Sequence, residues 1–475
     1  YYTSVNCKTI QIYKFVLFLI HFSSFMKIIV KKGLDISMKG VPDKIMADAS
    51  LSTYYAIKPS DYPNLTPKLL IKEGDEVKCG SPIFCDKYND VIIFVSPASG
   101  LVDKIIRGEK RRILAVTIVS DGNFTQLNTK PKDYSNLSRE ELKSDLLSSG
   151  LWPLIRMRPI DIIANPNDIP KSIFISSFDT NPLSPDYDFI MHNKSAEFNS
   201  GIELLKILGK CDVNLQVRND SDDVFLNAEN VEKNFVKGPH PSGNVGVQIH
   251  EIDPLNKGEV IWYINPQDVM IIGRFSLTGG YDASKVICVG GENISDKKYL
   301  KTISGSSINS ILKDSIILEN SRIISGSPLT GEIVKIDGFL GCYHHQISVI
   351  PEGNAYKFFL NDGWLSPGFS RFSASKAYPT WLLPKSKTYQ FDTNLNGEER
   401  SFVVSGQYEK VFPFDIYPVQ LIKSIITNDI EKMENLGIYE VSPEDFALCE
   451  FVCTSKINIQ EIVRNGLDLI YKECM

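Results

Sequence analysis

Apolar residues in the N-terminal part of the chain come in short runs that are separated by turn residues. Glu73-Gly74-Asp75 lies before Val77, and Pro97-Ala98-Ser99-Gly100 lies before Leu101-Val102. Glycine, serine and aspartate at such positions are typical of tight turns between strands. The region from 67 to 106 therefore predicts two matched β half-motifs.

Strand and helix patterns alternate in the middle of the chain. Ser138 and Glu141 have the spacing of a capping box, which predicts that a helix starts there. Short apolar runs at 171–178 and 213–217 predict buried strands on either side of an amphipathic helix over 199–208. This alternation indicates an open, mostly parallel α/β sheet.

Two loops of this sheet are candidate binding sites, because ligands of such sheets usually lie where strand ends meet loops. Asp179 and Asn181 follow the first predicted strand, and a Pro/Gly-rich loop runs from Gly238 to Gly246. Gly243 and Gly246 would free backbone N–H groups, as in a phosphate cradle. The loop has neither the dinucleotide fingerprint nor the P-loop ending, so a rigid loop that packs one domain on another is the favoured interpretation.

Composition indicates a globular protein of several domains. The chain has 475 residues, of which 43% are hydrophobic, and about three domains are expected for that length. The formal net charge of −6 argues against a nucleic-acid partner, which would require a basic face. Nine cysteines without regular spacing are typical of reduced thiols in a cytoplasmic protein. The six histidines form no zinc-hydrolase arrangement, and we predict no metal site and no catalytic residue.

The first 25 residues differ from the rest of the chain. The sequence begins with Tyr1, and its apolar run at 15–20 is too short to cross a bilayer. The run also lacks the small-residue cleavage site of a signal peptide. We expect residues 1–25 to be a non-native upstream extension and Met26 to be the native start. No later apolar run approaches bilayer length, so other subunits would have to hold the chain at a membrane.

The β half-motifs resemble the flattened barrel of biotinyl and lipoyl carrier domains. Carriers present a lysine at the tip of the hairpin between the two halves, and Lys87 occupies that place here. Tyr88 replaces the small residue or methionine that follows the carrier lysine, so an ordinary exposed lysine is the favoured interpretation. We interpret the barrel as a docking module.

Several short motifs, taken in chain order, carry a more specific resemblance. They include Ser96-Pro-Ala-Ser-Gly100, Arg156-Met-Arg-Pro159, Asp179-Thr-Asn-Pro-Leu183, Gly238-Pro-His-Pro-Ser-Gly243, Ile264-Asn-Pro-Gln-Asp-Val269 and Phe446-Ala-Leu-Cys-Glu-Phe-Val-Cys453. Together they closely resemble the NqrA family, which supplies one component of the Na⁺-translocating NADH:quinone reductase. Each motif is weak alone, but their common order is specific and covers nearly everything after Met26.

The resemblance implies a peripheral subunit, located at the cytoplasmic face of the inner (cell) membrane. The enzyme would move electrons from NADH to quinone and export Na⁺, and the partners of this chain would be the other subunits, B to F. NADH, FAD, FMN and an iron–sulfur centre are implied for those sister subunits. We expect no tightly bound cofactor and no turnover in this chain alone, while contact with quinone is part of what the resemblance implies.

The same resemblance implies the fold of the NADH-oxidising flavin subunit of respiratory complex I, an α/β multidomain architecture. The run Lys285-Val-Ile-Cys-Val289, followed by two glycines, suits a β-grasp strand. The expected parts are an N-terminal segment with a biotinyl/lipoyl-like barrel-sandwich at 26–122, a Rossmann-like α/β domain at 123–283, a β-grasp, SLBB-like domain at 284–335 and a mixed region at 336–475 that ends in helices.

Two features that would hold redox groups are incomplete. Cys449 and Cys453 would place two thiols on one face of a helix, whereas an iron–sulfur cubane needs four ligands. Cys342 and Cys474 could complete a set, but a buried cysteine pair is the favoured interpretation. Ser325-Gly-Ser-Pro-Leu-Thr330 only echoes the flavin-attachment context of the sister subunits, so we expect no covalent flavin.

Two functions stay open. One is a non-catalytic, quinone-contacting subunit of the pump, and the other is a free-standing soluble flavin or nucleotide oxidoreductase with the complex I-like fold. The missing dinucleotide fingerprint favours the first. A quinone contact needs an aromatic wall and a few polar groups. The aromatic and histidine residues available near the α/β domain are Trp152, His240, His250, Trp262, Tyr263 and Phe275.

Overall fold

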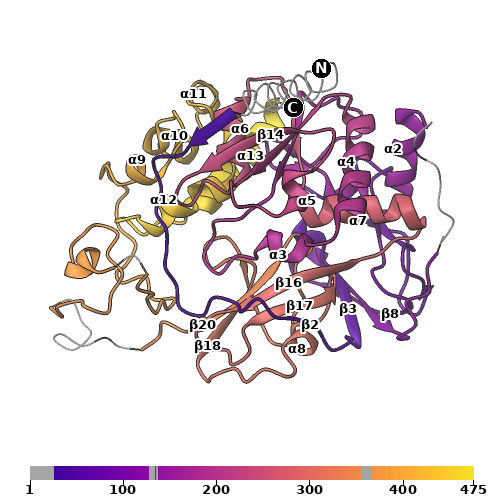
Figure 1. Ribbon diagram of the computed structural model, residues 1–475, viewed down its shortest axis with the longest axis horizontal. Helices are drawn as coiled ribbons and strands as arrows, with labels where there is room; N and C mark the ends of the chain where they lie inside the picture. Colours follow the sequence, from indigo (N-terminus) through magenta and orange to yellow (C-terminus); the bar gives the residue numbers. More distant parts are fainter. Residues whose placement is uncertain are drawn as a thin grey trace, which may run out of the picture.

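The computed structural model describes residues 26–127, 134, 137–355, 357, 365–384 and 386–474. Within these ranges the chain forms four sheets and a C-terminal group of helices (Figure 1). The extension predicted at 1–25 lies outside the described residues.

The central sheet of the described residues has seven strands. They are β1 (Met26–Ile29), β10 (Arg156–Arg158), β11 (Ile162–Ile163), β12 (Ser172–Ser176), β13 (Asp212–Val217), β14 (Glu232–Lys237) and β15 (Ile261–Tyr263). The order across the sheet is β1-β14-β13-β12-β15-β10-β11. The first five strands in this order, from β1 to β15, are parallel to one another. At the other edge, β10 runs antiparallel to β15, and β11 runs antiparallel to β10. The predicted open, mostly parallel α/β sheet is confirmed.

Helices cover this sheet on both faces (Figure 1). They are α2 (Arg139–Ser148), α3 (Tyr187–Met191), α4 (Ser195–Gly209), α5 (Asp223–Leu226), α6 (Val245–Ile252) and α7 (Pro266–Thr278). The capping box of α2 is confirmed, because the Ser138 hydroxyl accepts the Glu141 N–H and the Glu141 carboxylate accepts the Ser138 N–H. Helices α4 and α7 come into close contact at Gly201 of α4 and Gly273 of α7. A Cβ on Gly273 would stand 1.8 Å from the Glu197 carbonyl oxygen, so this close contact requires glycine.

The N-terminal barrel-sandwich consists of two small sheets. One contains β3 (Tyr54–Ile57), β5 (Glu76–Val77), β8 (Gly100–Arg107) and β9 (Ile113–Ser120), and the other contains β4 (Pro67–Leu69), β6 (Pro82–Asp86) and β7 (Ile93–Val95). The turn residue Gly100 has a φ of 147°, and a Cβ there would stand 1.9 Å from the Val119 carbonyl oxygen. Lys87 is exposed in the turn between β6 and β7. The predicted half-motifs therefore form paired strands.

A mixed six-stranded sheet of the described residues forms the third domain. Its strands are β2 (Met46–Asp48), β16 (Ser284–Gly290), β17 (Lys298–Ile303), β18 (Ser321–Ser325), β19 (Glu332–Val334) and β20 (Gln346–Pro351), with the short helix α8 (Ile308–Ile311) beside them. The N-terminal segment connects three domains, since β1 pairs with β14 of the central sheet and β2 pairs with β17. Residues 26–48 thus lie outside the barrel sheets.

The helices after residue 407 pack against the central sheet near β1 and β14 (Figure 1). They are α9 (Tyr408–Val411), α10 (Pro418–Ile426), α11 (Ile430–Asn435), η5 (Ile438–Glu440), η6 (Pro443–Phe446), α12 (Ala447–Phe451) and α13 (Ile459–Cys474). The short helix η4 (Pro379–Leu382) lies apart from them at the left edge of the molecule. Helix α12 ends before Cys453, so Cys449 and Cys453 do not share a helix as predicted; both are buried, and the Tyr408 hydroxyl donates to Cys453 Sγ at 2.9 Å. Among the described helices, none combines the length and apolar character needed to cross a bilayer.

Candidate functional site

A cavity of about 380 Å³ lies at the carboxyl ends of β12 and β15. This is the edge where loops of a parallel sheet are expected to form a binding site. Four parts of the chain contribute to its wall. They are Asp61 beside the barrel, the loops after β12, β14 and β15, residues 326–330 and 343–346 of the third domain, and Pro443, Glu444 and Gln460 of the helical part.

The loop after β12 lines the cavity at two of the predicted positions. Asp179 Oδ1 accepts hydrogen bonds from the backbone N–H of Asn181 at 2.7 Å and from its side-chain amide at 2.9 Å. Asn181 Oδ1 in turn accepts from the Ser327 hydroxyl at 3.2 Å, which connects the sheet to the third domain. Burial raises the pKa of Asp179, although the hydrogen bonds from Asn181 and Thr180 oppose that shift.

The Pro/Gly-rich loop after β14 is packed tightly at all three predicted glycines. A Cβ on Gly238 would stand 2.5 Å from the Val30 carbonyl oxygen, and one on Gly246 would stand 2.5 Å from a carboxylate oxygen of Asp445. Gly243 lies on the cavity wall, and its N–H donates to the Thr180 hydroxyl at 3.0 Å. Gly246 thus contacts the helical part, whereas Gly238 and Gly243 pack against the N-terminal segment and the loop after β12.

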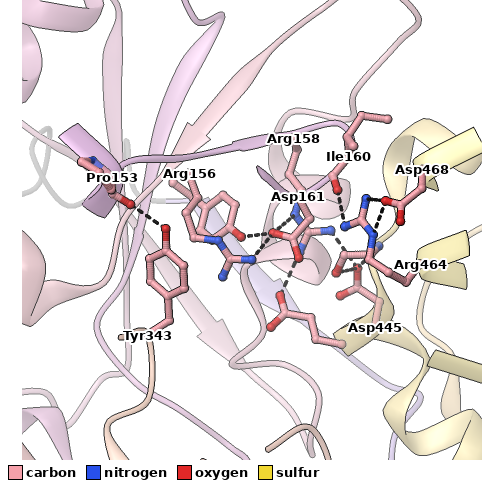
Figure 2. Close-up of polar contacts among 12 residues, drawn as sticks. Pro153, Arg156, Arg158, Ile160, Asp161, Tyr343, Asp445, Arg464 and Asp468 are labelled. Carbon is pink, nitrogen blue, oxygen red and sulfur yellow. Dashed lines mark hydrogen bonds and ion pairs between the residues drawn. The ribbon is translucent and has the colours of Figure 1, made fainter. Parts of the chain in front are cut away.

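An ionic cluster forms one side of the cavity (Figure 2). Arg156 Nη2 lies 2.7 Å from Asp161 Oδ1, and the Tyr263 hydroxyl donates to the same carboxylate. Arg158 is almost fully buried and binds both Glu444, at 2.8 Å, and Asp445, at 3.2 Å. Because β10 carries both arginines and η6 carries both of these acids, the cluster joins the central sheet to the C-terminal helices.

Within this cluster, burial and the neighbouring arginines shift the pKa values of the acids in opposite directions. Burial alone would raise the pKa of Asp161, but the charges of Arg156 and Arg158 outweigh it and hold the pKa below its ordinary value. Burial raises the pKa of Glu444 to about 7, although Arg158 opposes that shift. The Arg156 guanidinium also lies between two aromatic rings, 5.1 Å from the centre of Tyr263 and 4.6 Å from that of Tyr343.

Asp268 is the exceptional acid of the cavity. It lies in the first turn of α7, it is 6% exposed, and it lines the cavity. Over the described ranges, no hydrogen-bond donor or cation contacts its carboxylate. Burial raises its pKa to about 7, against the weaker opposing charges of Lys285 and Arg156. Lys285 itself is occupied, because its ammonium donates to the carbonyls of Gly341, Cys342 and His344 at 3.3, 2.7 and 3.0 Å.

Of the six aromatic and histidine candidates, the structure brings only Tyr263 to the cavity wall. Trp152 and Trp262 are fully buried and meet edge to face with ring centres 5.6 Å apart. Phe275 packs on α7 against Tyr134. Neighbouring residues of a strand point to opposite faces, which explains why Trp262 faces the core while Tyr263 faces the cavity.

The two candidate histidines have structural partners. His240 Nδ1 lies 3.0 Å from the Thr180 hydroxyl, and burial lowers the pKa of His240 to about 4. His250 Nδ1 lies 2.9 Å from Glu440, and its Nε2 accepts the backbone N–H of Asp415 at 3.1 Å. His240 supports the loop after β12, whereas His250 joins α6 to the helical part.

The residues that sequence reasoning missed as site residues are Arg156, Asp268 and Tyr343. Arg156 and Asp268 stand inside two of the short motifs that carry the family resemblance. One signal was available for Asp268, because Asn265-Pro266 directly after a strand predicts a helix start at the edge of the sheet. The third domain supplies Tyr343, and no local pattern links it to the sheet.

The fold and the cavity define a class: a multidomain α/β protein whose barrel-sandwich, central sheet, third domain and helices meet around one polar site. Family models match each of the first three parts. They are the NqrA N-terminal barrel-sandwich hybrid domain at 28–121, the NqrA second alpha/beta domain at 137–281 and the NQRA C-terminal domain, of SLBB type, at 286–335. The predicted fold class is confirmed.

Relatives match nearly the whole chain. The A subunit of the Na(+)-translocating NADH-quinone reductase of Neisseria meningitidis serogroup B is 36% identical over 94% of this chain and 99% of its own length. The protein of the same name from Tolumonas auensis is 35% identical over 94% of this chain and 100% of its own length. The chain belongs to the NqrA family of the Na⁺-translocating NADH-quinone reductase, and so has a role in that oxidoreductase complex.

Likeness to solved structures is weaker. A chain of an NAD⁺-reducing nickel–iron hydrogenase in the H₂-reduced state gives a TM-score of 0.36 at 11% identity, over 72% of this chain and 63% of that chain. This similarity is too low to support an argument.

Proposed function

We propose that this chain is a peripheral subunit that lies at the cytoplasmic face of the membrane, where it supports electron transfer from NADH to quinone coupled to Na⁺ export. The nearly full-length relationship to NqrA proteins of the reductase is the observation that carries this proposal. The other subunits, B to F, would be its partners and would hold the NADH-oxidising and flavin centres. In this proposal the chain binds no redox cofactor tightly and has no turnover alone.

We propose further that the cavity at the ends of β12 and β15 contacts the quinone headgroup. A quinone site needs an aromatic wall and a few oriented polar groups. The rings of Phe178, Tyr187, Tyr263 and Tyr343 line this cavity. A volume of about 380 Å³ is within the range of small-molecule sites.

Asp268 is the polar group best suited to a quinone in this cavity. Its carboxyl faces the cavity, and a pKa of about 7 leaves both protonation states accessible near neutral pH. The neutral acid can donate a hydrogen bond to a quinone carbonyl, and the carboxylate can accept one from a quinol hydroxyl. Arg156, by contrast, is committed to Asp161. Within the six candidates chosen from sequence, Tyr263 is the residue that this proposal retains.

Steady-state kinetics of the purified complex with an Asp268→Leu chain tests the proposal. Leucine has about the size of aspartate but can neither donate nor accept a hydrogen bond. We expect the KM for quinone to rise about tenfold, which corresponds to one hydrogen bond of about 1.4 kcal/mol, while the KM for NADH stays unchanged.

Asp253→Leu is the matched control. Asp253 binds Ser172 and Lys171 at the opposite end of β12, at 2.7 and 2.6 Å. We expect this variant to leave both KM values unchanged. An Asp268→Leu complex that keeps the parental KM for quinone would exclude the cavity as the quinone contact, although the chain would still be a subunit of the reductase.

A further inference from the structure

The segment from 365 to 391 differs in charge from the rest of the chain. It contains Arg371, Lys376, Lys385 and Lys387 but no aspartate or glutamate, whereas the whole chain has a net charge of −6. In Figure 1 the segment is an orange lobe at the left edge of the molecule, beside the C-terminal helices. A local excess of positive charge on an acidic protein calls for a specific explanation.

The inner side of this lobe is fixed to the body of the protein. Phe372 packs against Tyr389 and Phe391, with ring centres 5.6 and 5.5 Å apart, and against Phe451 of α12 at 6.2 Å. The Tyr389 N–H donates to the Ser37 carbonyl at 2.8 Å. The lobe therefore has a defined inner face and presents its other side outward.

The outer side carries large apolar side chains without a core to cover them. Phe369 is 64% exposed, Trp381 is 54% exposed and Leu382 is 68% exposed. The two tryptophans of the central domain, Trp152 and Trp262, are fully buried, so the exposure of Trp381 is unusual for this chain. The Lys376 ammonium lies 5.5 Å from the centre of the Trp381 ring, which places positive charge directly beside the exposed apolar group.

We propose that the outer side of the 365–391 lobe docks on an anionic phospholipid surface. Tryptophan and leucine beside lysine are suited to the boundary between headgroups and acyl chains, where the apolar part is buried and the charge stays in the headgroup layer. Charge of one sign matches an anionic lipid surface. Protein interfaces are depleted of lysine around their apolar centre, whereas here Lys376 lies directly beside Trp381. This lobe would orient the protein on the bilayer independently of the cavity.

Sedimentation of the full chain with lipid vesicles tests this proposal. We expect binding to vesicles of equal phosphatidylglycerol and phosphatidylcholine and no binding to pure phosphatidylcholine. Binding should weaken between 50 and 500 mM NaCl (roughly a threefold shorter Debye length), because salt screens exposed charges. Lys376→Glu should weaken binding about 25-fold, since losing one positive charge costs about fivefold and the new negative charge costs about fivefold more.

Matched variants on other surfaces distinguish this lobe from general surface charge or apolarity. Lys110→Glu changes an exposed lysine of the barrel, and Ile316→Ser changes a 71% exposed residue of the third domain. We expect both to bind vesicles like the parent chain. Trp381→Ser with Leu382→Ser should lose binding while its thermal unfolding is unchanged, because both side chains are exposed.

Three outcomes would overturn the proposal. The first is no binding to anionic vesicles, and the second is binding that Lys376→Glu and the Trp381→Ser, Leu382→Ser variant leave intact. The third is a chain whose vesicle binding is absent but whose co-purification with another subunit depends on Trp381 and Leu382. That result would assign the lobe to a protein interface.

Discussion

The two sides of the cavity differ in whether their buried acids have charged partners. On one side, Arg156 and Arg158 form ion pairs with Asp161, Glu444 and Asp445 at distances between 2.7 and 3.2 Å. On the other side, the carboxyl of Asp268 is buried without a charged or hydrogen-bonding partner within the described ranges, and its pKa is raised to about 7. Both sides contribute acids to the wall of the cavity, but only on one side do arginines pair with them.

This difference distinguishes residues that hold domains together from a residue that could bind a ligand. A buried cluster of ion pairs holds domains together, because breaking it leaves an uncompensated charge in the interior. A buried acid without a partner reduces stability unless a ligand or a proton satisfies it. We therefore propose that the ionic cluster docks the domains and that Asp268 contacts the ligand.

The largest effect on stability is expected when the ionic cluster loses one of its arginines. Arg158→Met would leave Glu444 and Asp445 without their shared cation and should destabilise the protein by about 3 to 5 kcal/mol at pH 8. Urea unfolding checks this value. The loss should be smaller at pH 5.5, since the raised pKa of Glu444, about 7, lets that acid take up a proton.

Arg322→Met is the control for this prediction. Arg322 pairs with Glu352 at a site where both side chains are about 30% exposed, and such pairs are worth at most about 1 kcal/mol. Equal losses for Arg158→Met and Arg322→Met would contradict the view that the buried cluster docks the domains.

An effect of opposite sign on stability is expected when Asp268, the acid without a partner, is replaced. The folded-state pKa of Asp268 is about 7, above the ordinary 3.8, so the folded state binds more protons than the unfolded state between these values. Stability contributed by this group is therefore present below about pH 4 and is lost as the pH rises through 7. Asp268→Asn removes that loss and should stabilise the protein by about 4 kcal/mol at pH 8, with little change at pH 4.

Unfolding of Asp268→Asn and of the parent chain at both pH values gives this difference. Asp253→Asn serves as the control, because the Asp253 carboxylate is paired with Lys171 at 2.6 Å. A destabilised Asp268→Asn chain at pH 8 would show that the carboxylate has a stabilising partner, which would remove the contrast between the two sides.

Local signals in the sequence were sufficient for the elements that surround the cavity. The capping box at Ser138, the apolar run of β12 and the loop at Asp179 were predictable because each depends on neighbouring residues. The rule that ligands lie at the carboxyl ends of parallel strands then selected Asp179, Asn181, Gly238, Gly243 and Gly246. Asp179, Asn181 and Gly243 line the cavity, whereas Gly238 and Gly246 do not.

Contacts between distant segments could not be predicted in the same way. Arg158 and Asp445 are 287 residues apart, and β1 pairs with β14 across more than 200 residues. Aromatic type alone selected Trp152 and Trp262, although burial in the core attracts tryptophan as strongly as a ligand does. The side of the strand that faces the cavity depends on register, which only the assembled sheet defines.

Photolabelling of the purified complex with a photoreactive quinone, followed by peptide mapping of this chain, tests the central claim most directly. The account predicts label on residues 176–187, 263–268 and 343–346 that excess quinone displaces and that Asp268→Leu reduces. Displaceable label confined to other subunits, or to surfaces of this chain away from the cavity, would contradict it.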